Sequence, residues 1–452
     1  MATDRYDNAR LRELDIAHHL HPVSNLKQVA ANGPLVMVRG EGSTIWDADG
    51  KEYIDAFAGL WNINVGHGRK VLADTAKQQI EEIAYGPTFF GLATPPPIEL
   101  AAKLAGMYPG PVNHFQFTSG GAESNETALK IARYYWALRG KPEKVTILSR
   151  MMGYHGIAMG ALSATGIPAY WANFGPRPEG FVHLMAPYSY RNADDPDDED
   201  AFVDKLVAEL EEVIEREGAD TIAAMIGEPV QGAGGVVPPP QSYWTRVKEI
   251  LDANDILLIA DEVITGFGRT GTMFGVEQYD VQPDIVSIAK GVTSGYIPLG
   301  AVGVTDDVFT VMLEPDAMFM HGFTYSGHPV ACAVGLRNVE IIESERLDEK
   351  AGEIGPYLQG RLEELLGHQN VGDVRGKGMM MIVEVVKDKQ SKEPFTAADG
   401  AGAKLTKATR ERGIIVRAGD NGISIAPPLV LTREEADRVA TAVQDSIVEV
   451  FG

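Results

Sequence analysis

The sequence predicts an α/β fold, in which a large domain with a mostly parallel sheet flanked by helices is joined by a smaller α+β domain. Three observations predict it. Short apolar runs rich in β-branched residues alternate with helical patterns through the middle of the chain. Charge, Gly or Pro bounds each run, as is typical of strands buried on both faces of a sheet. The two ends of the chain carry different, mixed patterns, which suggests that they combine into the second domain.

The strands and helices of the large domain are expected in a regular order. A strand over 114–118 is broken by Ser119, Gly120 and Gly121, and a helix follows whose apolar residues recur at helical spacing until Gly140. Later apolar runs predict strands at 145–148, 222–226, 256–259 and 285–288, with a helix over 243–253 among them. Strands that alternate with helices form a parallel sheet, and ligands bind where the carboxyl ends of such strands meet.

The ends of the chain predict the smaller domain. Residues 34–58 contain strand-like pieces around a turn at Asp49-Gly50, and 360–452 mix helix with a hairpin through Arg417, Gly419 and Gly422. We therefore divide the chain into an N-terminal segment of the small domain (1–65), a large domain (66–330) and a C-terminal small domain (331–452).

Composition excludes several classes of protein. The 452 residues are 44% hydrophobic and 23% charged, which are ordinary globular values. With 40 basic and 63 acidic residues the net charge is −23, so the chain repels phosphate backbones and anionic membranes, and neither nucleic acid nor a membrane is an expected partner. Cys332 is the one cysteine, which excludes a disulfide within the chain.

Other features bear on location and metal binding. Met1–Arg12 lacks the apolar core of a signal peptide, and no stretch approaches about 18 apolar residues, so a cytoplasmic protein is expected. The acidic run 194–200 is interpreted as a solvated loop ahead of a helix. A metal site there is the alternative, but the run lacks the turn glycine and closing glutamate of a calcium loop, and no metal is expected.

Reactive groups follow the expected strands. Gly120, Gly121 and Ala122 precede a helix whose free N–H groups and positive dipole end suit a phosphate, although a plain tight turn has the same pattern. Tyr154 and His155 lie between glycines after the second strand, where an aromatic ring could stack on a flat ligand or simply fill the core.

Two acids and a lysine complete the set. Glu228 and Asp261 each follow an apolar run, and a buried carboxylate needs a partner such as a protonated ring nitrogen, a helix end or a salt bridge. Lys290 follows the last strand, where partial burial would lower its pKa and free the amine as nucleophile and base. A phosphate site, a ring partner, an acid and a lysine at one sheet edge are together what pyridoxal phosphate requires.

At this point the sequence resembles the class III pyridoxal-phosphate-dependent aminotransferases, or ω-aminotransferases. Matching stretches occur in the family's order across nearly the whole chain: SGGAESNE at 119–126, GYHG at 153–156, EPVQG at 228–232, ADEVITGFGR at 260–269, AKG at 289–291 and HGFTYSGHP at 321–329. The stretch at 260–269 is the most specific. The resemblance implies the type I fold of pyridoxal-phosphate-dependent transferases, with the cofactor bound by the large domain.

The resemblance also implies roles for individual residues. Lys290 would form the Schiff base with the cofactor and shuttle the proton, and Asp261 would pair with the pyridine nitrogen. The backbone amides of Gly120, Gly121 and Ala122 would bind the phosphate. Val263 and Tyr154 would contact the two faces of the ring. Further cofactor contacts would come from His155, from Glu228 near the ring hydroxyl, and from Thr324 of a second subunit. The family often has a serine at position 120 or 122, and its absence here gives the backbone amides more weight. Thr324 implies a homodimer with shared sites.

The substrate residues are implied by the amine:pyruvate branch of the family. Trp61 would line the large pocket with Tyr154, and Phe89 and Phe90 would come from the neighbouring subunit. Arg417 resembles a mobile arginine that pairs with the carboxylate of pyruvate or alanine and swings aside for apolar amines. A salt bridge on a strand face is the alternative for Arg417.

The expected activity is a ping-pong transamination from a primary amine or ω-amino acid to pyruvate or another small 2-oxo acid. A racemase or decarboxylase of the same class would keep the cofactor and change the reaction. A non-enzymatic binding protein would not need Lys290 together with Asp261. The physiological donor, whether taurine, β-alanine, a polyamine or an aryl-alkyl amine, is left open.

Overall fold

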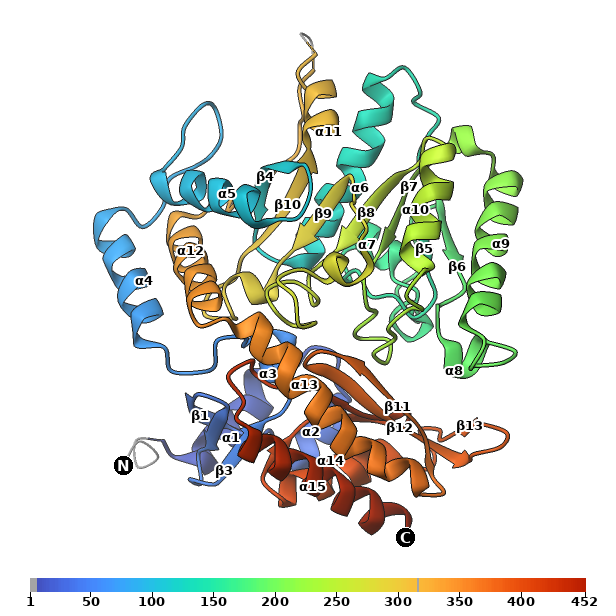
Figure 1. Cartoon of the computed structure of the whole chain (residues 1–452). Helices are drawn as coiled ribbons and strands as arrows, with labels where there is room; N and C mark the ends of the chain where they lie inside the picture. The colour runs from blue at the N-terminus through green and yellow to red at the C-terminus, as the bar shows by residue number, and fades with distance from the viewer. Residues whose placement is uncertain (1–5, 315–316) are drawn as a thin grey trace.

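A seven-stranded sheet forms the centre of the computed structural model, which describes residues 6–314 and 317–452 (Figure 1). Its strands are β4 (Val112–Thr118), β5 (Thr146–Arg150), β6 (Phe181–Leu184), β7 (Ile222–Gly227), β8 (Leu257–Asp261), β9 (Ile285–Ile288) and β10 (Gly300–Thr305). Their order is β4-β10-β9-β8-β7-β5-β6. Residues 1–5, which begin the expected segment 1–65 and the stretch Met1–Arg12, lie outside the described residues.

The sheet is mostly parallel, as predicted. Strands β5 to β9 pair in parallel, whereas β10 runs antiparallel to both β9 and β4. The sequence did not indicate β6 or β10. Strand β10 begins at Gly300 and contains Gly303, and these glycines interrupt the apolar pattern by which a strand is predicted. Both glycines are needed, because an added Cβ would lie 2.5 Å from Ser124 Oγ at position 300 and 2.5 Å from Phe115 at position 303.

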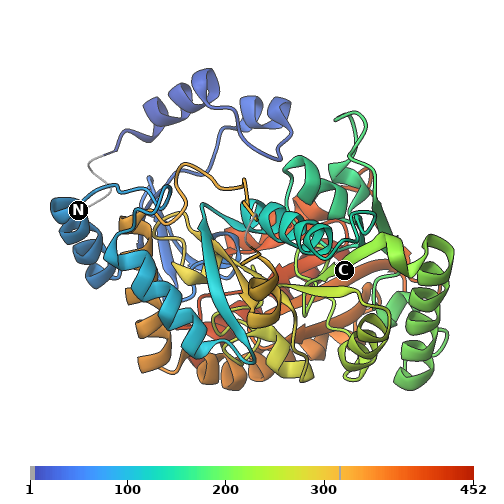
Figure 2. The same cartoon turned by 90° about the horizontal axis from the view of Figure 1, so that it is seen from above.

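Helices cover both faces of this sheet (Figures 1 and 2). They include α4 (Lys70–Glu82), α5 (Pro95–Met107), α6 (Gly121–Leu138), α7 (Met159–Ala164), α8 (Ser189–Asn192), α9 (Glu199–Glu217), α10 (Tyr243–Ala253), α11 (Asp306–Val311) and α12 (Pro329–Ser344). Helix α10 has the bounds that the sequence predicted. The acidic run 194–200 was predicted to be a loop ahead of a helix, which is correct only for 194–198. Glu199 and Asp200 form the first turn of α9, because the Asp198 side chain caps the helix by accepting a hydrogen bond from the Ala201 amide.

The two ends of the chain meet beside the large sheet. Strands β1 (Met37–Glu41), β2 (Thr44–Asp47) and β3 (Glu52–Asp55) continue into β14 (Ile414–Ile415), which pairs in parallel with β3. A second sheet contains β11 (Val371–Lys377), β12 (Met380–Asp388), β13 (Glu393–Pro394), β15 (Arg417–Gly419) and β16 (Gly422–Ile425). The expected hairpin is therefore β15–β16, paired Gly419 to Gly422. The boundaries at 65 and 330 stay a prediction.

The remaining helices either belong to the smaller part of the molecule or stand away from its body. Helices α13 (Leu347–Glu363), α14 (Ala401–Glu411) and α15 (Arg433–Phe451) belong to the lower part of Figure 1, and the short α3 (Ala58–Trp61) lies between the two parts. Helices α1 (Asn8–His18) and α2 (Leu26–Asn32) have no buried residues and form an arm that stands off the body (Figure 2). Within residues 6–314 and 317–452, no helix is both long and apolar enough to cross a membrane.

Candidate active site

A cavity of about 180 Å³ lies at the carboxyl ends of β7, β8 and β9. It brings together eight of the residues that the sequence singled out: Gly121, Ala122, Tyr154, His155, Glu228, Asp261, Val263 and Lys290. Gly120 directly precedes them as the N-cap of α6. The parallel strands explain this convergence, because segments far apart in the chain end at the same edge of one sheet.

Asp261 is the last residue of β8 and is 1% exposed. Its Oδ2 atom lies 2.7 Å from Asn125 Nδ2 and 2.7 Å from His155 Nδ1, and Oδ1 accepts a hydrogen bond from the Val263 amide at 3.1 Å. These contacts orient the carboxylate and offset the cost of burying it. Their partners come from α6, from the loop after β5 and from the loop after β8, so the acid is fixed from three sides.

Lys290 follows β9 and is half-buried at the cavity, with a left-handed backbone (φ 45°). Burial lowers the pKa of Lys290 to about 8, although Asp261 and Glu228 oppose the shift by attracting the charged amine. The strain of a left-handed non-glycine residue is typical of functional positions. A lysine with this pKa has a useful fraction of free amine near neutral pH, as a nucleophile or proton carrier needs.

Glu228 lies on the other side of the cavity and is also buried. Its Oε1 accepts a hydrogen bond from the Tyr154 amide at 3.0 Å, and its Oε2 accepts one from the Gly232 amide at 2.8 Å. Burial raises the pKa of Glu228, and the nearby charge of Asp261 adds to the shift. This glutamate therefore joins the loop that carries Tyr154 to the loop that begins at Gly232.

The start of α6 forms the anion cradle. Gly120 makes no side-chain cap, so the first N–H groups of the helix are left for a ligand. The space is shaped by glycine, because an added Cβ at position 121 would lie 2.8 Å from Val263 Cγ1. Buried His155 Nε2 and Asn125 Oδ1 lack a partner among the described residues. Free N–H groups at a helix end, a buried carboxylate and a half-buried lysine around one cavity fit pyridoxal phosphate.

The sequence analysis missed two kinds of residue. Asn125 holds Asp261, and its signal was its place inside the SGGAESNE stretch, one turn into the helix. Ile157 and Ile264 add apolar wall, which no local pattern distinguishes from ordinary core.

Five predicted residues do not line this cavity. Trp61 is buried and packs edge-on against Phe57, with ring centroids 4.8 Å apart. Arg417 is exposed near the entrance and donates a 3.3 Å hydrogen bond to the Ala233 carbonyl. Thr324 is exposed, and Phe89 and Phe90 line a separate depression described below. Their roles stay predictions.

Comparison with known proteins decides the family. The family described as Aminotransferase class-III matches residues 27–447. The chain belongs to the class III aminotransferases. It is therefore a transaminase that depends on pyridoxal phosphate and works by a ping-pong mechanism, and the sequence resemblance is confirmed.

Several relatives of this class III aminotransferase are close over their full length. A putrescine–pyruvate aminotransferase of Pseudomonas aeruginosa is 43% identical over 96% of this chain and 95% of its own. An (S)-enantioselective ω-transaminase from Thermomicrobium roseum has a TM-score of 0.97 and 61% identity, with 99% of each chain covered. An amine transaminase from an uncultivated Pseudomonas species, solved with pyridoxal phosphate bound, has a TM-score of 0.93 and 41% identity over 95% of this chain and 98% of that one. The fold class is thereby confirmed.

Proposed function

We propose that this aminotransferase moves the amino group of a primary amine or ω-amino acid to pyruvate or another small 2-oxo acid in the cytoplasm. When bound, pyridoxal phosphate supplies the electron sink that lets the amino group leave one substrate and join the next. The observation that carries the proposal is the position of Arg417. It is exposed beside the cavity, and its hydrogen bond to Ala233 is long. Burial is the main cause that lowers the pKa of Lys290, and the positive charge of Arg417 adds to that shift.

Such an arginine suits two unlike substrates. A guanidinium grips a carboxylate through two hydrogen bonds, so it would bind pyruvate or alanine. A long side chain on the exposed hairpin β15–β16 can leave again when an apolar amine enters, at the cost of one weak contact. The P. aeruginosa relative is named for putrescine, an amine without a carboxylate, and for pyruvate, which has one.

The other residues of the site have roles that follow from their places. Lys290 would hold and move the proton at Nζ, and Asp261 would face the ring nitrogen with a carboxylate kept in place by Asn125 and His155. Gly120, Gly121 and Ala122 would hold the phosphate, and Val263 and Tyr154 would enclose the ring. Lys290 is half-buried, which limits the access of bulk water to its amine.

A panel of amines with pyruvate as acceptor tests the proposal, with alanine formation as the measurement. We expect alanine in equal amount to the aldehyde or ketone formed from the amine. Racemised substrate, or carbon dioxide released without alanine, would instead identify a racemase or decarboxylase.

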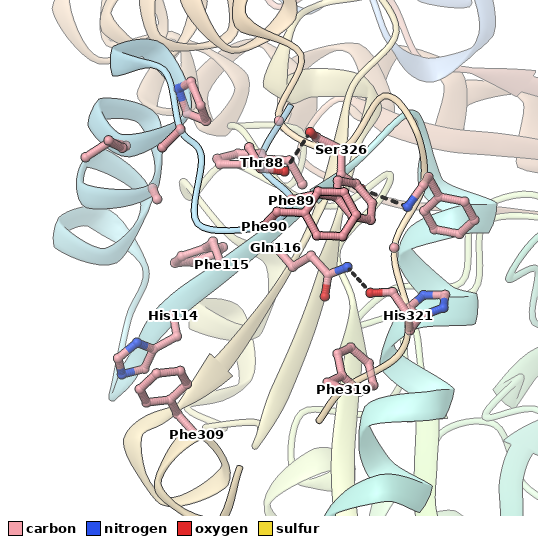
Figure 3. Close-up of a pocket in the computed structure, with 18 of the residues that line it drawn as sticks. Thr88, Phe89, Phe90, His114, Phe115, Gln116, Phe309, Phe319, His321 and Ser326 are labelled. Carbon is pink, nitrogen blue, oxygen red and sulfur yellow. Dashed lines mark hydrogen bonds between the residues drawn. The ribbon is translucent and has the colours of Figure 1, made fainter. Parts of the chain in front are cut away.

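The proposal includes a homodimer with shared sites. A depression of about 1160 Å³ is lined by apolar and aromatic side chains, including Phe89, Phe90, Phe115 and Phe319 (Figure 3). Phe90 is 95% exposed and Met320 is 84% exposed, which a monomer rarely tolerates in one patch. A second copy of the chain would cover this surface.

The loops that carry Phe89 and Thr324 are bonded to each other. Tyr85 Oη donates to the Thr324 carbonyl at 2.7 Å, and Thr88 Oγ1 donates to the Ser326 carbonyl at 3.0 Å (Figure 3). Because neither loop lines the cavity of its own subunit, we infer that both complete the site of the partner.

Hybrid dimers test this sharing. In a hybrid of a Lys290→Ala chain with a Thr324→Val chain, shared sites leave one site with both native residues and one with neither. We expect about half of the native activity. A hybrid no more active than the Thr324→Val homodimer, or an active monomer in sedimentation, would contradict the shared site.

A further inference from the structure

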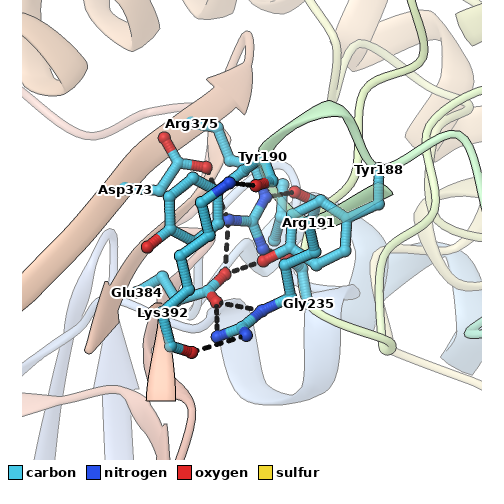
Figure 4. A network of polar contacts seen from close by, with 9 residues as sticks. Tyr188, Tyr190, Arg191, Gly235, Asp373, Arg375, Glu384 and Lys392 are labelled. Carbon is cyan, nitrogen blue, oxygen red and sulfur yellow. Dashed lines mark hydrogen bonds and ion pairs between the residues drawn. The ribbon is translucent and has the colours of Figure 1, made fainter. Parts of the chain in front are cut away.

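A buried carboxylate outside the cavity joins the C-terminal sheet to the large domain. Glu384, on β12, is 2% exposed. Its two oxygens accept hydrogen bonds from Arg375 Nη1 at 2.6 Å, from Arg191 Nε at 2.8 Å and from the Tyr188 hydroxyl (Figure 4). Arg375 lies on β11, whereas Tyr188 and Arg191 belong to the segment around α8. Burying an ion pair costs desolvation energy, so a gain in stability does not by itself explain why Glu384 and its arginines are present.

Arg375 also contacts the active-site side of the molecule. Its Nε donates to the Val236 carbonyl at 2.7 Å, and its Nη2 donates to the Gly235 carbonyl. Both carbonyls belong to residues 232–237, which we call the 232–237 loop. The guanidinium is thus held on one edge by Glu384 and by Asp373, whose Oδ2 lies 2.8 Å from Arg375 Nη1, and it holds this loop with the other edge (Figure 4).

Arg375 adds a side-chain anchor to a loop whose base is closed by two backbone hydrogen bonds between Gln231 and Val237. The loop contains Gly232, Gly234 and Gly235, and Val236 has a left-handed backbone (φ 46°), an unfavourable conformation for a β-branched residue. An added Cβ at position 234 would lie 2.0 Å from the Met152 carbonyl oxygen, so only glycine fits there. The glycines have no side chains that could restrict the motion of this backbone. Strained, glycine-rich backbone persists when surrounding contacts over-determine it.

The loop in turn contacts two residues of the site. The Gly232 amide donates to Glu228 Oε2 at 2.8 Å, and the Ala233 carbonyl accepts from Arg417 Nη1 at 3.3 Å. The carbonyls held by Arg375 therefore lie two and three residues from the one on which Arg417 rests.

We propose that Glu384 and Arg375 are positioning residues for substrate carboxylates: they fix the 232–237 loop, and the loop sets where Arg417 waits and how Glu228 is oriented. This inference rests on the proposed role of Arg417. Its consequence is selective. Loosening the loop weakens binding of pyruvate and alanine, which need Arg417, and leaves binding of an amine without a carboxylate nearly unchanged.

Three variants of the holoenzyme separate this role from a structural one. Arg375→Lys keeps the charge but cannot bond two successive carbonyls and Glu384 together. Glu384→Gln removes the buried one of the two carboxylates that orient Arg375 and leaves Asp373 in place. Arg191→Gln is the matched control, because Arg191 binds the same carboxylate but its remaining hydrogen bond goes to the Lys392 carbonyl and not to the loop.

Two measurements are made on each variant. The first is the Michaelis constant for alanine, pyruvate and benzylamine, with half-reactions followed by cofactor absorbance. The second is amide hydrogen exchange of the peptide that covers 232–237. In Arg375→Lys and Glu384→Gln we expect the constants for alanine and pyruvate to rise about tenfold, the loss of one hydrogen bond, with benzylamine changed less than about twofold. Exchange in the loop should quicken in these two variants and not in Arg191→Gln.

Equal losses for all three substrates, the same selective loss in Arg191→Gln, or unchanged loop exchange in Arg375→Lys would overturn the inference. Failure of the proposed function looks different. The wild-type enzyme would then form no alanine from pyruvate, while the exchange measurement would still report whether Arg375 and Glu384 hold the loop.

Discussion

At the bottom of the cavity, Asp261 is 1% exposed and three groups from three segments contact its carboxylate. At the entrance, Arg417 is exposed and rests on one carbonyl at 3.3 Å. The residues around Asp261 come from one chain, whereas the entrance depends on movable side chains; we propose that a second subunit contributes Thr324 to the cofactor and Phe89 and Phe90 to the substrate. The difference indicates that the site holds its cofactor rigidly and its substrates adaptably.

The largest expected effect is the loss of activity when Lys290 is removed from the region around Asp261. Lys290→Ala leaves the cavity without its amine, so covalent capture of the cofactor and proton transfer are both lost. We expect turnover to fall at least about a thousandfold, which is within the range of about 10²–10⁴ for loss of a positioned acid or base. Alanine formation measures it, and the loss of the yellow colour that resists dialysis confirms it. A variant with native turnover would sink the assignment of Lys290.

Changing the acid should weaken this region without emptying it. Asp261→Asn keeps the size of the side chain, but a neutral amide does not stabilise a protonated ring nitrogen. One pKa unit corresponds to about 1.4 kcal/mol, so a shift of two units slows turnover about a hundredfold. Stopped-flow half-reactions measure the rate, and absorbance shows that the cofactor stays bound. A rate within threefold of the native enzyme contradicts this role.

The adaptable region is tested by Arg417→Ala. A charge-assisted hydrogen bond contributes roughly 1.5–3 kcal/mol, so the Michaelis constants for pyruvate and alanine should rise about tenfold to a hundredfold. An amine without a carboxylate, such as benzylamine, should bind as well or better. Steady-state kinetics with both substrate types decide the matter, and equal losses for the two would mean that Arg417 is structural.

The smallest expected effect is the pH dependence of cofactor capture by Lys290, which lies deeper in the site than the exposed Arg417. Because burial lowers the pKa of Lys290 to about 8, the amine is mostly protonated at pH 7 and about half free at pH 8. The rate at which the apoenzyme captures pyridoxal phosphate should therefore rise about fivefold from pH 7 to 8 and level off above about pH 9. Absorbance after mixing follows the reaction. A rate that climbs steadily to pH 10 would show that Lys290 keeps an ordinary pKa.

The two regions were also unequally predictable from the sequence. Strands β7 to β9 are continuous apolar runs, so Glu228, Asp261 and Lys290 could be placed at their ends. Asn125 was not predicted, because its contact with Asp261 joins two elements that only the folded sheet brings together.

Residues near the entrance were harder to place for a different reason. A motif does not say which chain a side chain serves, as Thr324 illustrates, or whether a large ring lines a pocket or fills the core, as Trp61 illustrates. Strand β10 was missed because Gly300 and Gly303, which let it pack closely, also erase the apolar pattern of a strand.

Strand β4 leads into the anion cradle, yet its neighbour in the sheet is β10, at residues 300–305. During synthesis on the ribosome, the cradle is made early but cannot dock until β10 has left the exit tunnel, because such distant pairing must wait for the whole intervening chain. Until then β4 is an unpaired edge that invites wrong partners. The pairing of β4 therefore waits for a glycine-containing strand that lies far from the cradle in sequence.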